Sequence, residues 1–270
     1  MDQDAFTTFE HEGWEHVGQP YQDDFEPLTT QSIAPLLDAL GVARGTRFLD
    51  VATGLGALAA SAASRGAAVT GIDFSAAMLA QARCRYPDID FHEASAEDLP
   101  FDEGMFDAVG SNYGMLHFPH PEKALSEAYR VLCSGGKLIF TVWAFPERAV
   151  GLGMVLEAVK AYGKLDVPIP PGPPFFRFSN ADESLRALRD AGFSDPEVHE
   201  LSQTWHIAAP ETPFDLLRRC TVRTAAILKA QSPDALVKIR EAVAESAAPY
   251  RVGDEFQVPM DCVLASATKR

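Results

Sequence analysis

Residues 48–59, FLDVATGLGALA, decide how the first half of this chain folds. A short apolar run contains Asp50 and leads into a loop with glycines at positions 54 and 56, followed by alanine-rich sequence. This order is typical of a strand that turns sharply into a helix, because glycine tolerates backbone angles that side chains exclude. The loop also fits the pattern G-x-G-x-x-G/A, which in dinucleotide-binding proteins places a pyrophosphate at a helix N-terminus. The stretch predicts a ligand-binding turn, and its neighbours must identify the ligand.

The sequence on both sides of this turn alternates between strand and helix. We predict strands at 47–51, 68–72, 89–94, 106–112 and 137–143, and helices at 28–40, 56–64, 76–85 and 121–132. Thr29 or Thr30 is expected to cap the first of these helices, and Ser75 the third. Alternation at this spacing favours βαβ units and a parallel sheet with helices on both faces.

The alternation stops after Pro146. Residues 164–178 contain five prolines and are expected to form a loop or a lid. We predict further helices at 150–162, 181–191, 213–230 and 233–247, and strands near 196–206 and at 256–266, the last with a break at Pro259. Because a strand returns at the very end, we expect a single domain with an insertion.

Composition limits the classes of protein that this chain can belong to. With 270 residues, 47% of them hydrophobic, the chain can bury a sizeable core. A net charge of −15 without any basic run disfavours nucleic-acid binding. The four cysteines lie far apart, and no apolar run approaches the roughly 20 residues that span a bilayer. These features predict a soluble, cytoplasmic protein with reduced thiols and no membrane partner, and they leave the oligomeric state open.

Two downstream segments bear on the identity of the ligand. Asp73 ends the second predicted strand 17 residues after Gly56, where a carboxylate can accept both hydroxyls of a ribose, whichever cofactor carries it. Residues 93–109, EASAEDLPFDEGMFDAV, form an acidic segment that leads into Leu-Pro-Phe and Phe-Asp.

Together these segments resemble the class I S-adenosylmethionine (SAM)-dependent methyltransferases, especially small-molecule enzymes such as the ubiquinone/menaquinone C-methyltransferases. The family loop D-x-G-x-G-x-G is matched by Asp50, Ala52, Gly54 and Gly56, and the acidic strand end with its S-x-x-M-L helix is matched by Asp73, Ser75, Met78 and Leu79. The acidic segment is matched by residues 96–101 with Phe106 and Asp107. The family stretch E-x-x-R-V-L…G-G is matched by Glu127, Arg130, Val131, Leu132, Gly135 and Gly136. The resemblance spans residues 47–143.

The resemblance implies an α/β fold: a Rossmann-like, doubly wound, mostly parallel seven-stranded sheet. It also implies an N-terminal lid segment at 1–27, a SAM-binding core at 28–146, a helical and Pro-rich cap inserted after strand five at 147–180, and a C-terminal part at 181–270 that completes the sheet. The cofactor would be SAM, and the product S-adenosylhomocysteine.

The cofactor residues carry over by position. Asp50 would lie near the ammonium of SAM, Asp73 would hold the ribose, and Asn112 would lie beside the methyl donor. The other expected contacts are Thr53, Gly54 and Gly56 along the methionine moiety, Phe74 and Met78 around the adenine, the Ala96 N–H on an adenine ring nitrogen, and Tyr21 at the carboxylate end. Met78 could equally be a core position, and Tyr21 an aromatic core residue.

Two positions depart from the family pattern. Ala52 stands where the family has its first glycine, at some cost in the freedom of the loop. Ser95 stands where the family has the Asp that accepts from the adenine amino group. Glu97 or a backbone carbonyl is expected to take over that contact.

Methyl transfer needs an acceptor held in line behind the activated carbon, and a base only if the acceptor must lose a proton. His117 and Tyr21 are the candidate catalytic residues. His117 could instead pack or bond the backbone, with His120 capping the next helix. The candidate acceptor-binding residues are Trp14, Tyr113, His117, Trp143, Phe175 and Phe176. Their aromatic character predicts a small apolar or aromatic acceptor, and no metal site is expected.

Two other functions fit part of this pattern. An NAD(P)-dependent oxidoreductase would use the same G-x-G-x-x-A turn, but Asp50 is awkward beside a pyrophosphate and no Tyr-x-x-x-Lys set is present. A non-catalytic SAM-binding protein would keep the fold without the chemistry, which Ser95 and the lack of an obvious base leave open.

Overall fold

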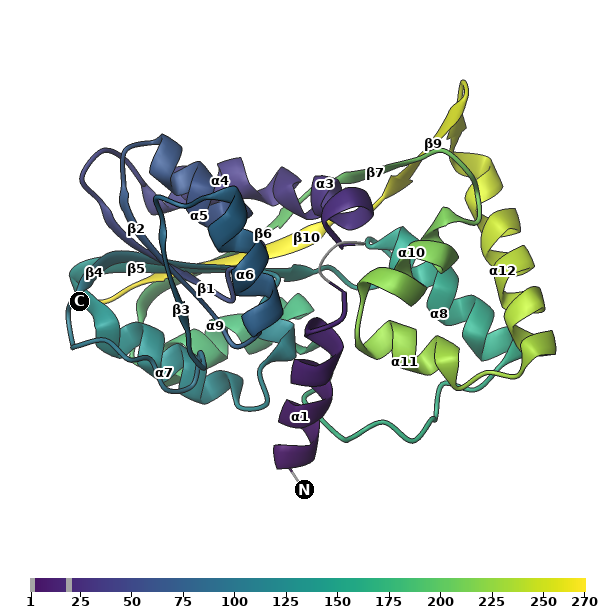
Figure 1. The fold of residues 1–270 in the computed structure, drawn as a ribbon, viewed down its shortest axis with the longest axis horizontal. Coiled ribbons are helices and arrows are strands. Elements are labelled where there is room, and N and C mark those ends of the chain that lie inside the picture. The colour runs from purple at the N-terminus through teal and green to yellow at the C-terminus, as the bar shows by residue number, and fades with distance from the viewer. Residues whose placement is uncertain (1–2, 18–20) are drawn as a thin grey trace. The chain divides into compact units, whose positions relative to one another are not determined.

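The computed structural model describes residues 3–17 and 21–270 and divides the chain into two compact units, each made of separate stretches. The sheet unit comprises Thr29–Val142, Gly172–Leu201 and Val263–Arg270. The helical unit comprises Met1–Leu28, Trp143–Pro171 and Ser202–Cys262. Figure 1 shows the elements of both units along the chain. The division into lid, core and cap remains a prediction.

A seven-stranded sheet forms the centre of the sheet unit. Its order is β3 (Asp90–Glu93), β2 (Ala68–Asp73), β1 (Arg47–Val51), β4 (Phe106–Asn112), β5 (Leu132–Trp143), β10 (Cys262–Thr268) and β6 (Ser194–Leu201). β1 pairs in parallel with β2 and β4, and so do β2 with β3 and β4 with β5. Lys269, just after β10, exchanges backbone hydrogen bonds with Gly135 and Gly136 near the start of β5, so these two neighbours run antiparallel. The predicted mostly parallel, seven-stranded α/β sheet is confirmed.

Helices cover both faces of this sheet. They are α4 (Ile33–Leu40), α5 (Ala57–Ser64), α6 (Ala76–Arg85), α7 (Pro121–Val131) and α9 (Ala181–Asp190). Figure 1 shows α4 and α5 on one face and α7 and α9 on the other. Under α4 and α5, Leu36, Phe48 and Ile139 are fully buried in one apolar cluster. The small side chains of α5 let this helix approach β1 closely, which brings its N-terminus to the end of that strand.

Of the two predicted helix caps, the one at Ser75 is confirmed. Ser75 caps α6 by accepting from the Met78 N–H, and Gly41 ends α4 in a left-handed conformation with φ of 70°. The predicted cap at Thr29 or Thr30 is wrong. Helical backbone already begins at α3 (Glu26–Thr29) and runs through the short turn Thr30–Ser32 into α4, so Thr29 makes no capping bond.

The structure corrects three predicted elements: two are split, and one begins earlier. The strand predicted near 196–206 is two strands in different sheets, β6 and β7 (Thr204–Ile207). The helix predicted at 213–230 is α10 (Thr212–Cys220) and α11 (Arg223–Lys229). The final strand breaks as expected near Pro259, into β9 (Glu255–Pro259) and β10, and a short β8 (Arg251–Val252) precedes it. β5 begins five residues earlier than predicted, at Leu132 instead of Lys137.

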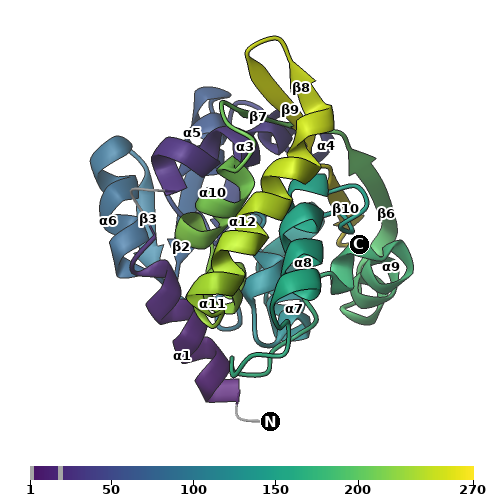
Figure 2. The ribbon, with the colours of Figure 1, turned by 90° about the vertical axis from the view of Figure 1, so that its right-hand side faces the viewer.

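The helical unit holds α1 (Gln3–Trp14), α8 (Val150–Tyr162), α10, α11, α12 (Pro233–Ala247) and a small antiparallel sheet in the order β7-β9-β8. Figure 2 shows α12 alongside α8, which it contacts. No helix in residues 3–17 or 21–270 is long and apolar enough to cross a membrane.

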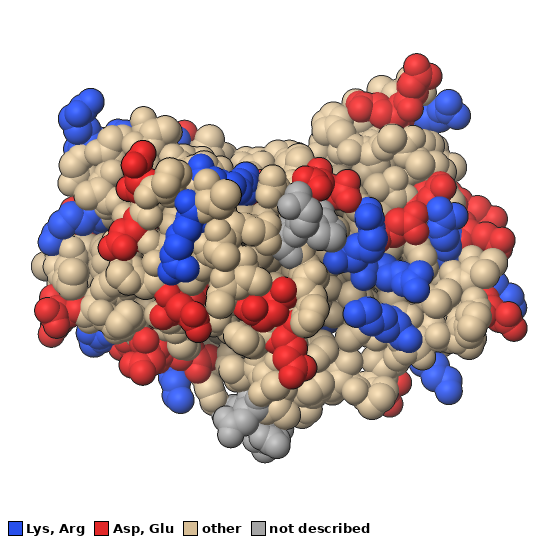
Figure 3. Space-filling model, viewed as in Figure 1, with Lys and Arg blue, Asp and Glu red and all other residues tan. Residues whose placement is uncertain are grey.

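Two contacts fix α1 within the helical unit. Gly13 packs so closely on Val222 that a Cβ would lie 2.5 Å from its methyl group. Glu10, which is fully buried, accepts from Arg223 Nε at 2.8 Å, and the guanidinium lies 4.4 Å from the centroid of the Phe6 ring. On the face shown in Figure 3, basic side chains gather over α10 and α11, with acidic side chains beside them.

Candidate cofactor site and active site

The glycine loop opens at the carboxyl edge of β1. Ala52, Gly54 and Gly56 have positive φ angles of 58°, 54° and 85°. A side chain at Gly54 would meet no atom within 4 Å, whereas one at Gly56 would press on Phe91 and Tyr86 at 3.0 Å. Gly56 is therefore needed for packing, and the open side of Gly54 leaves backbone accessible to a ligand.

Asp73, at the end of β2, lies against this loop. Its two carboxylate oxygens accept from the N–H groups of Gly54 and Ser75 at 2.8 and 2.9 Å. A carboxylate has about four acceptor positions, so it can still accept from a ribose hydroxyl. Burial raises the pKa of Asp73 to about 6, against these hydrogen bonds and the charge of His117, which lower it. Asp73 is thus an ionisable acceptor beside the glycine loop, as a ribose-binding residue requires.

Asp50 lies buried behind the loop. One oxygen accepts from Thr53 Oγ1 at 2.7 Å and from the Ala59 N–H of α5 at 3.0 Å. The other oxygen, Oδ1, has no hydrogen-bond partner in the described part of the chain. Burial raises the pKa of Asp50 to about 7, and the negative charge of Asp73 adds to the effect. A buried carboxylate oxygen without a partner fits an expected cationic ligand group such as the ammonium of SAM.

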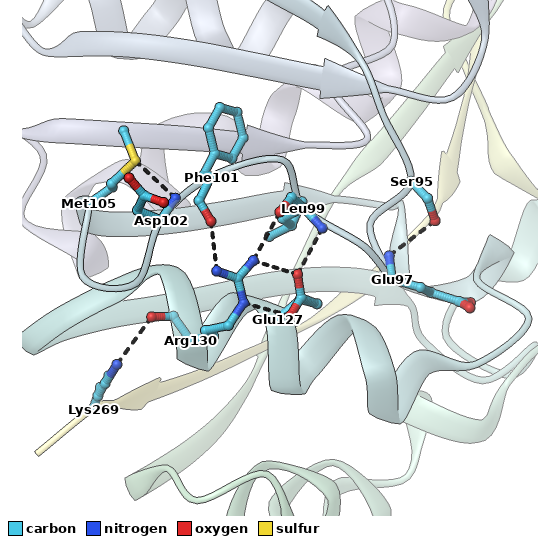
Figure 4. Close-up of polar contacts among 9 residues, drawn as sticks. All are labelled: Ser95, Glu97, Leu99, Phe101, Asp102, Met105, Glu127, Arg130 and Lys269. Atoms are coloured by element: carbon cyan, nitrogen blue, oxygen red, sulfur yellow. Dashed lines mark hydrogen bonds and ion pairs between the residues drawn. The ribbon is translucent and has the colours of Figure 1, made fainter.

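The segment expected to bind adenine is a tight turn. Ser95 Oγ accepts from the Glu97 N–H at 3.1 Å, and Ala96 between them is buried (Figure 4). Glu97 Oε1 accepts from the His120 N–H at 2.6 Å, just before α7. That carboxylate is one of the two groups predicted to replace the family Asp for adenine, the other being a backbone carbonyl, and here it already holds the start of α7. His120 occupies the N-cap of α7 without a side-chain capping bond, and Pro121 lies in the first turn.

Arg130 and Glu127 of α7 clamp the residues that follow this turn (Figure 4). Arg130 donates to the carbonyls of Phe101 and Leu99 at 2.6 and 2.9 Å, and Glu127 accepts from the Leu99 N–H at 2.8 Å. Arg130 Nη2 also donates to Glu127 Oε2 at 2.7 Å. The E-x-x-R motif therefore fixes the loop that begins with the candidate adenine segment.

The carboxyl end of β4 holds three more predicted residues. Asn112 Oδ1 accepts from Ser32 Oγ at 2.7 Å and from Thr141 Oγ1 at 2.6 Å. Tyr113 is buried with φ of 60°, a conformation rare for an aromatic residue. His117 follows in the short turn Met115–His117, and its charge acts on Asp73. The chain after β4 lies against the loop after β1, because a Cβ on Gly114 would come within 2.7 Å of the Ala52 Cβ.

Other predicted residues lie in different settings. Met78 is buried on α6, and Phe74 is half-buried just before it. Phe175 and Phe176 belong to the sheet unit, with ring centroids 4.9 Å apart.

Trp14, Tyr21 and Trp143 belong to the helical unit. The rings of Trp14 and Tyr21 lie 5.9 Å apart, and Phe25 joins Tyr21 to Trp143 at 5.6 and 6.0 Å. Trp205 completes this aromatic cluster, 5.5 Å from Phe25. Neither Phe25 nor Trp205 is a predicted site residue, because isolated aromatic residues carry no periodic signal.

Comparisons with known proteins agree with this geometry. Residues 49–140 match the model of the methyltransferase domain family. The chain is 33% identical over 176 residues to a demethylmenaquinone methyltransferase of Renibacterium salmoninarum, covering 62% of this chain and 74% of that protein. It is 48% identical over 178 residues to the demethylmenaquinone methyltransferase of Chlorobaculum parvum, covering 59% of this chain and 70% of that protein.

A solved structure shares the fold. It is phosphoethanolamine N-methyltransferase 2 of Haemonchus contortus in complex with phosphomonomethylethanolamine and S-adenosylhomocysteine, with a TM-score of 0.54 and 23% identity over 88% of this chain and 52% of that one. Neither an oxidoreductase nor a non-catalytic role is favoured by these relatives. The sheet, the glycine loop with its two carboxylates, and the relatives lead to one conclusion: this chain belongs to the class I SAM-dependent methyltransferases that act on small molecules.

Proposed function

We propose that the glycine loop and the ends of β2 and β4 hold SAM, and that the methyl group goes to a small acceptor with an aromatic ring. The observation that carries the cofactor assignment is Asp73. Its carboxylate accepts from the Gly54 N–H at 2.8 Å and keeps acceptor capacity for a ribose hydroxyl.

The remaining cofactor contacts follow from this placement. Asp50 Oδ1 faces the ammonium, the backbone of Thr53, Gly54 and Gly56 follows the methionine moiety, and the turn at Ser95–Glu97 holds the adenine. The unpartnered Oδ1 and the open side of Gly54 support these assignments. Tyr21, Ala52, Phe74, Met78 and Asn112 complete the proposed set.

For the acceptor we propose a hydroquinone or phenol. Two relatives carry the name demethylmenaquinone methyltransferase, and Tyr113, Phe175 and Phe176 offer aromatic surface within the sheet unit. Trp14, Tyr21 and Trp143 are retained as acceptor-binding candidates of the helical unit, with residues 1–27 as lid and 147–180 as cap. We place the protein in the cytoplasm, without nucleic-acid or membrane partners.

The chemistry asks little of the protein beyond placement. SAM, when bound, supplies an activated methyl group, and the chain holds the acceptor in line and excludes water. We assign His117 as the base that removes a proton from the acceptor, with Tyr21 as a second candidate. A phenol or quinol needs such a proton acceptor because its anion is the stronger nucleophile.

Transfer of label from [methyl-³H]SAM tests this proposal. The purified protein is incubated with a short-chain demethylmenaquinol, simple phenols and, for comparison, aliphatic amines, and extracts are counted and analysed by mass spectrometry. We expect label in a quinol or phenol and none in the amines. Label in the amines alone would overturn the acceptor class. Thermal stabilisation by NAD⁺ and none by S-adenosylhomocysteine would overturn the cofactor assignment.

A further inference from the structure

A buried polar network lies directly behind the carboxyl end of β4. The Asn112 side chain is its centre: Oδ1 accepts from Ser32 Oγ and Thr141 Oγ1, and Nδ2 donates to the Thr29 carbonyl at 3.0 Å. Ser32 and Thr141 are completely buried. Three segments that are distant in sequence are therefore held at one amide group.

The Thr141 hydroxyl has a second role in this network. While it donates to Asn112 Oδ1 at 2.6 Å, its oxygen accepts from the Tyr113 N–H at 3.1 Å. The same N–H lies 3.2 Å from the Thr141 carbonyl, so β5 holds the Tyr113 backbone at two points. Tyr113 has φ of 60°, and such a conformation persists only where the surroundings over-determine it.

This held residue lies beside the cofactor loop. A Cβ on Gly114 would come within 2.7 Å of the Ala52 Cβ, so the chain after β4 packs directly on the loop after β1. Among the described residues, the non-glycine positions with positive φ are Ala52, Tyr113 and Asp195. Two of these three therefore meet at this one place, and strained backbone of this kind concentrates at functional sites.

We propose that Thr141 is a positioning residue for methyl transfer, which acts by holding Tyr113 in its left-handed conformation while its own hydroxyl is oriented by Asn112. The held backbone sets the direction in which residues 113–117, including His117, leave the end of β4 toward the cofactor loop. The predicted effect on turnover rests on the proposed function. The predicted effect on the backbone conformation of Tyr113 does not depend on it.

The hydroxyl of Thr141 can be changed without altering the shape of the core. Thr141→Val has nearly the same volume but neither donates to Asn112 nor accepts from Tyr113. Thr141→Ser keeps both bonds. Thr221→Val in the helical unit is a matched control, because the Thr221 hydroxyl likewise donates to a carbonyl (Leu217) and accepts from an N–H (Ala225).

The experiment measures turnover of a demethylmenaquinol or phenol, the dissociation constant of S-adenosylhomocysteine, and crystal structures with that product bound. For Thr141→Val we expect kcat to fall about 100-fold, the size of a small misplacement of reacting groups, with the dissociation constant changed less than about threefold. Thr141→Ser should recover most of the turnover, and Thr221→Val should leave it unchanged. A loss in Thr141→Val no larger than in Thr221→Val would overturn the proposal.

The structural readout needs no acceptor. In Thr141→Val, Tyr113 should leave the left-handed region; Tyr113 retained at φ near 60° would overturn the proposal. If the wild-type protein methylates no quinol or phenol, the acceptor class is wrong, and this structural comparison alone decides the role of Thr141. If Thr141→Val does not fold, Thr141→Ala removes the same two hydrogen bonds: reduced turnover with unchanged product affinity supports the proposal, and turnover equal to that of Thr141→Ser overturns it.

Discussion

At the scale of the residue, Ala52 carries a methyl group in a backbone conformation that favours glycine. Its φ of 58° costs an L-residue about 1 kcal/mol relative to glycine. We therefore expect Ala52→Gly to raise the free energy of unfolding by about 1 kcal/mol. Ala60→Gly, in the middle of α5, is the control and should lower it by about 1 kcal/mol. Urea titration measures both variants, and a loss of stability in Ala52→Gly would show that the methyl contacts outweigh the strain.

A second residue-scale prediction concerns Asp73. Asp73→Asn should weaken the binding of S-adenosylhomocysteine by about 1–3 kcal/mol, the size of a hydrogen bond to a charged group. Asp90→Asn on the neighbouring β3 is a suitable control because the Asp90 side chain is 70% exposed. Isothermal titration calorimetry compares them. Equal affinities of Asp73→Asn and wild type would remove Asp73 from the proposed cofactor site.

The buried carboxylates also predict a dependence of stability on pH. Burial raises the pKa of Asp50 to about 7 and that of Asp73 to about 6, above the 3.8 of a free side chain. At pH values between 3.8 and these raised pKa values, the folded, cofactor-free protein keeps protons on Asp50 and Asp73 that the unfolded chain releases. The contribution of these groups to the free energy of unfolding therefore falls as pH rises from about 4 to 7.

Asp50→Asn isolates this contribution. The variant cannot ionise at position 50, so its free energy of unfolding should fall less than that of the wild type between pH 5 and pH 8. Chemical denaturation of both proteins at the two pH values measures the difference. Parallel losses in the two proteins would contradict an elevated pKa at Asp50.

Sequence reasoning placed Asp50 within the first strand, Asp73 at the end of the second and His117 after the fourth, because ligand-binding turns use few residue types in fixed order. The binding roles of these residues and of the loop glycines stay predictions. Sequence reasoning did not reach Ser32 or Thr141, since a hydroxyl residue inside a helix or strand looks like any other. Their significance depends on Asn112, which lies 80 residues from Ser32 and 29 residues from Thr141 in the chain.

At the scale of the element, α7 does more than cover the sheet, because its Glu127–Arg130 pair holds the loop at residues 99–101. We expect Arg130→Met to lower the free energy of unfolding by about 2 kcal/mol, since two carbonyls and a carboxylate lose a charged donor. Arg270→Met is the control: its ion pair with Asp195 is exposed and should contribute about 0–1 kcal/mol. Urea unfolding compares them, and equal losses would show that the clamp is dispensable.

Elements with strong local signals were predicted closely. β1, β4, α8 and α12 have the predicted bounds, because alternating or helical periodicity and flanking breakers define them. The prediction of a single strand near 196–206 was wrong because the break between β6 and β7 is caused by hydrogen bonds to residues far away in the sequence. The Gln203 N–H donates to Asp261 Oδ1, and the Gln203 carbonyl accepts from the Met260 N–H, which redirects the chain into a second sheet.

At the scale of the whole molecule, the helical unit depends on a buried ion pair near the start of the chain. Arg223→Met leaves the Glu10 carboxylate buried without its cation, and we expect a loss of about 3–5 kcal/mol in the free energy of unfolding. Arg219→Met removes an exposed pair with Asp24 and should cost about 1 kcal/mol or less. The double variant Glu10→Gln/Arg223→Met should recover part of the loss. No recovery would mean that packing of Arg223 on Phe6, rather than charge, dominates.

The sheet topology could be predicted from the sequence, and the division into two units could not. Alternating strands and helices imply a parallel sheet by local rules, whereas the helical unit assembles stretches from the beginning, middle and end of the chain. No pattern within any one stretch reveals that assembly.

The interleaving of the two units along the chain affects how a whole unit could be exchanged with that of a relative by recombination. The chain passes between the two units five times, after residues 28, 142, 171, 201 and 262. A recombinant made with one or two crossover points would therefore always contain at least one unit whose stretches come from different parents. Grafting the helical unit of a relative onto this sheet unit therefore requires all five junctions to be made at once.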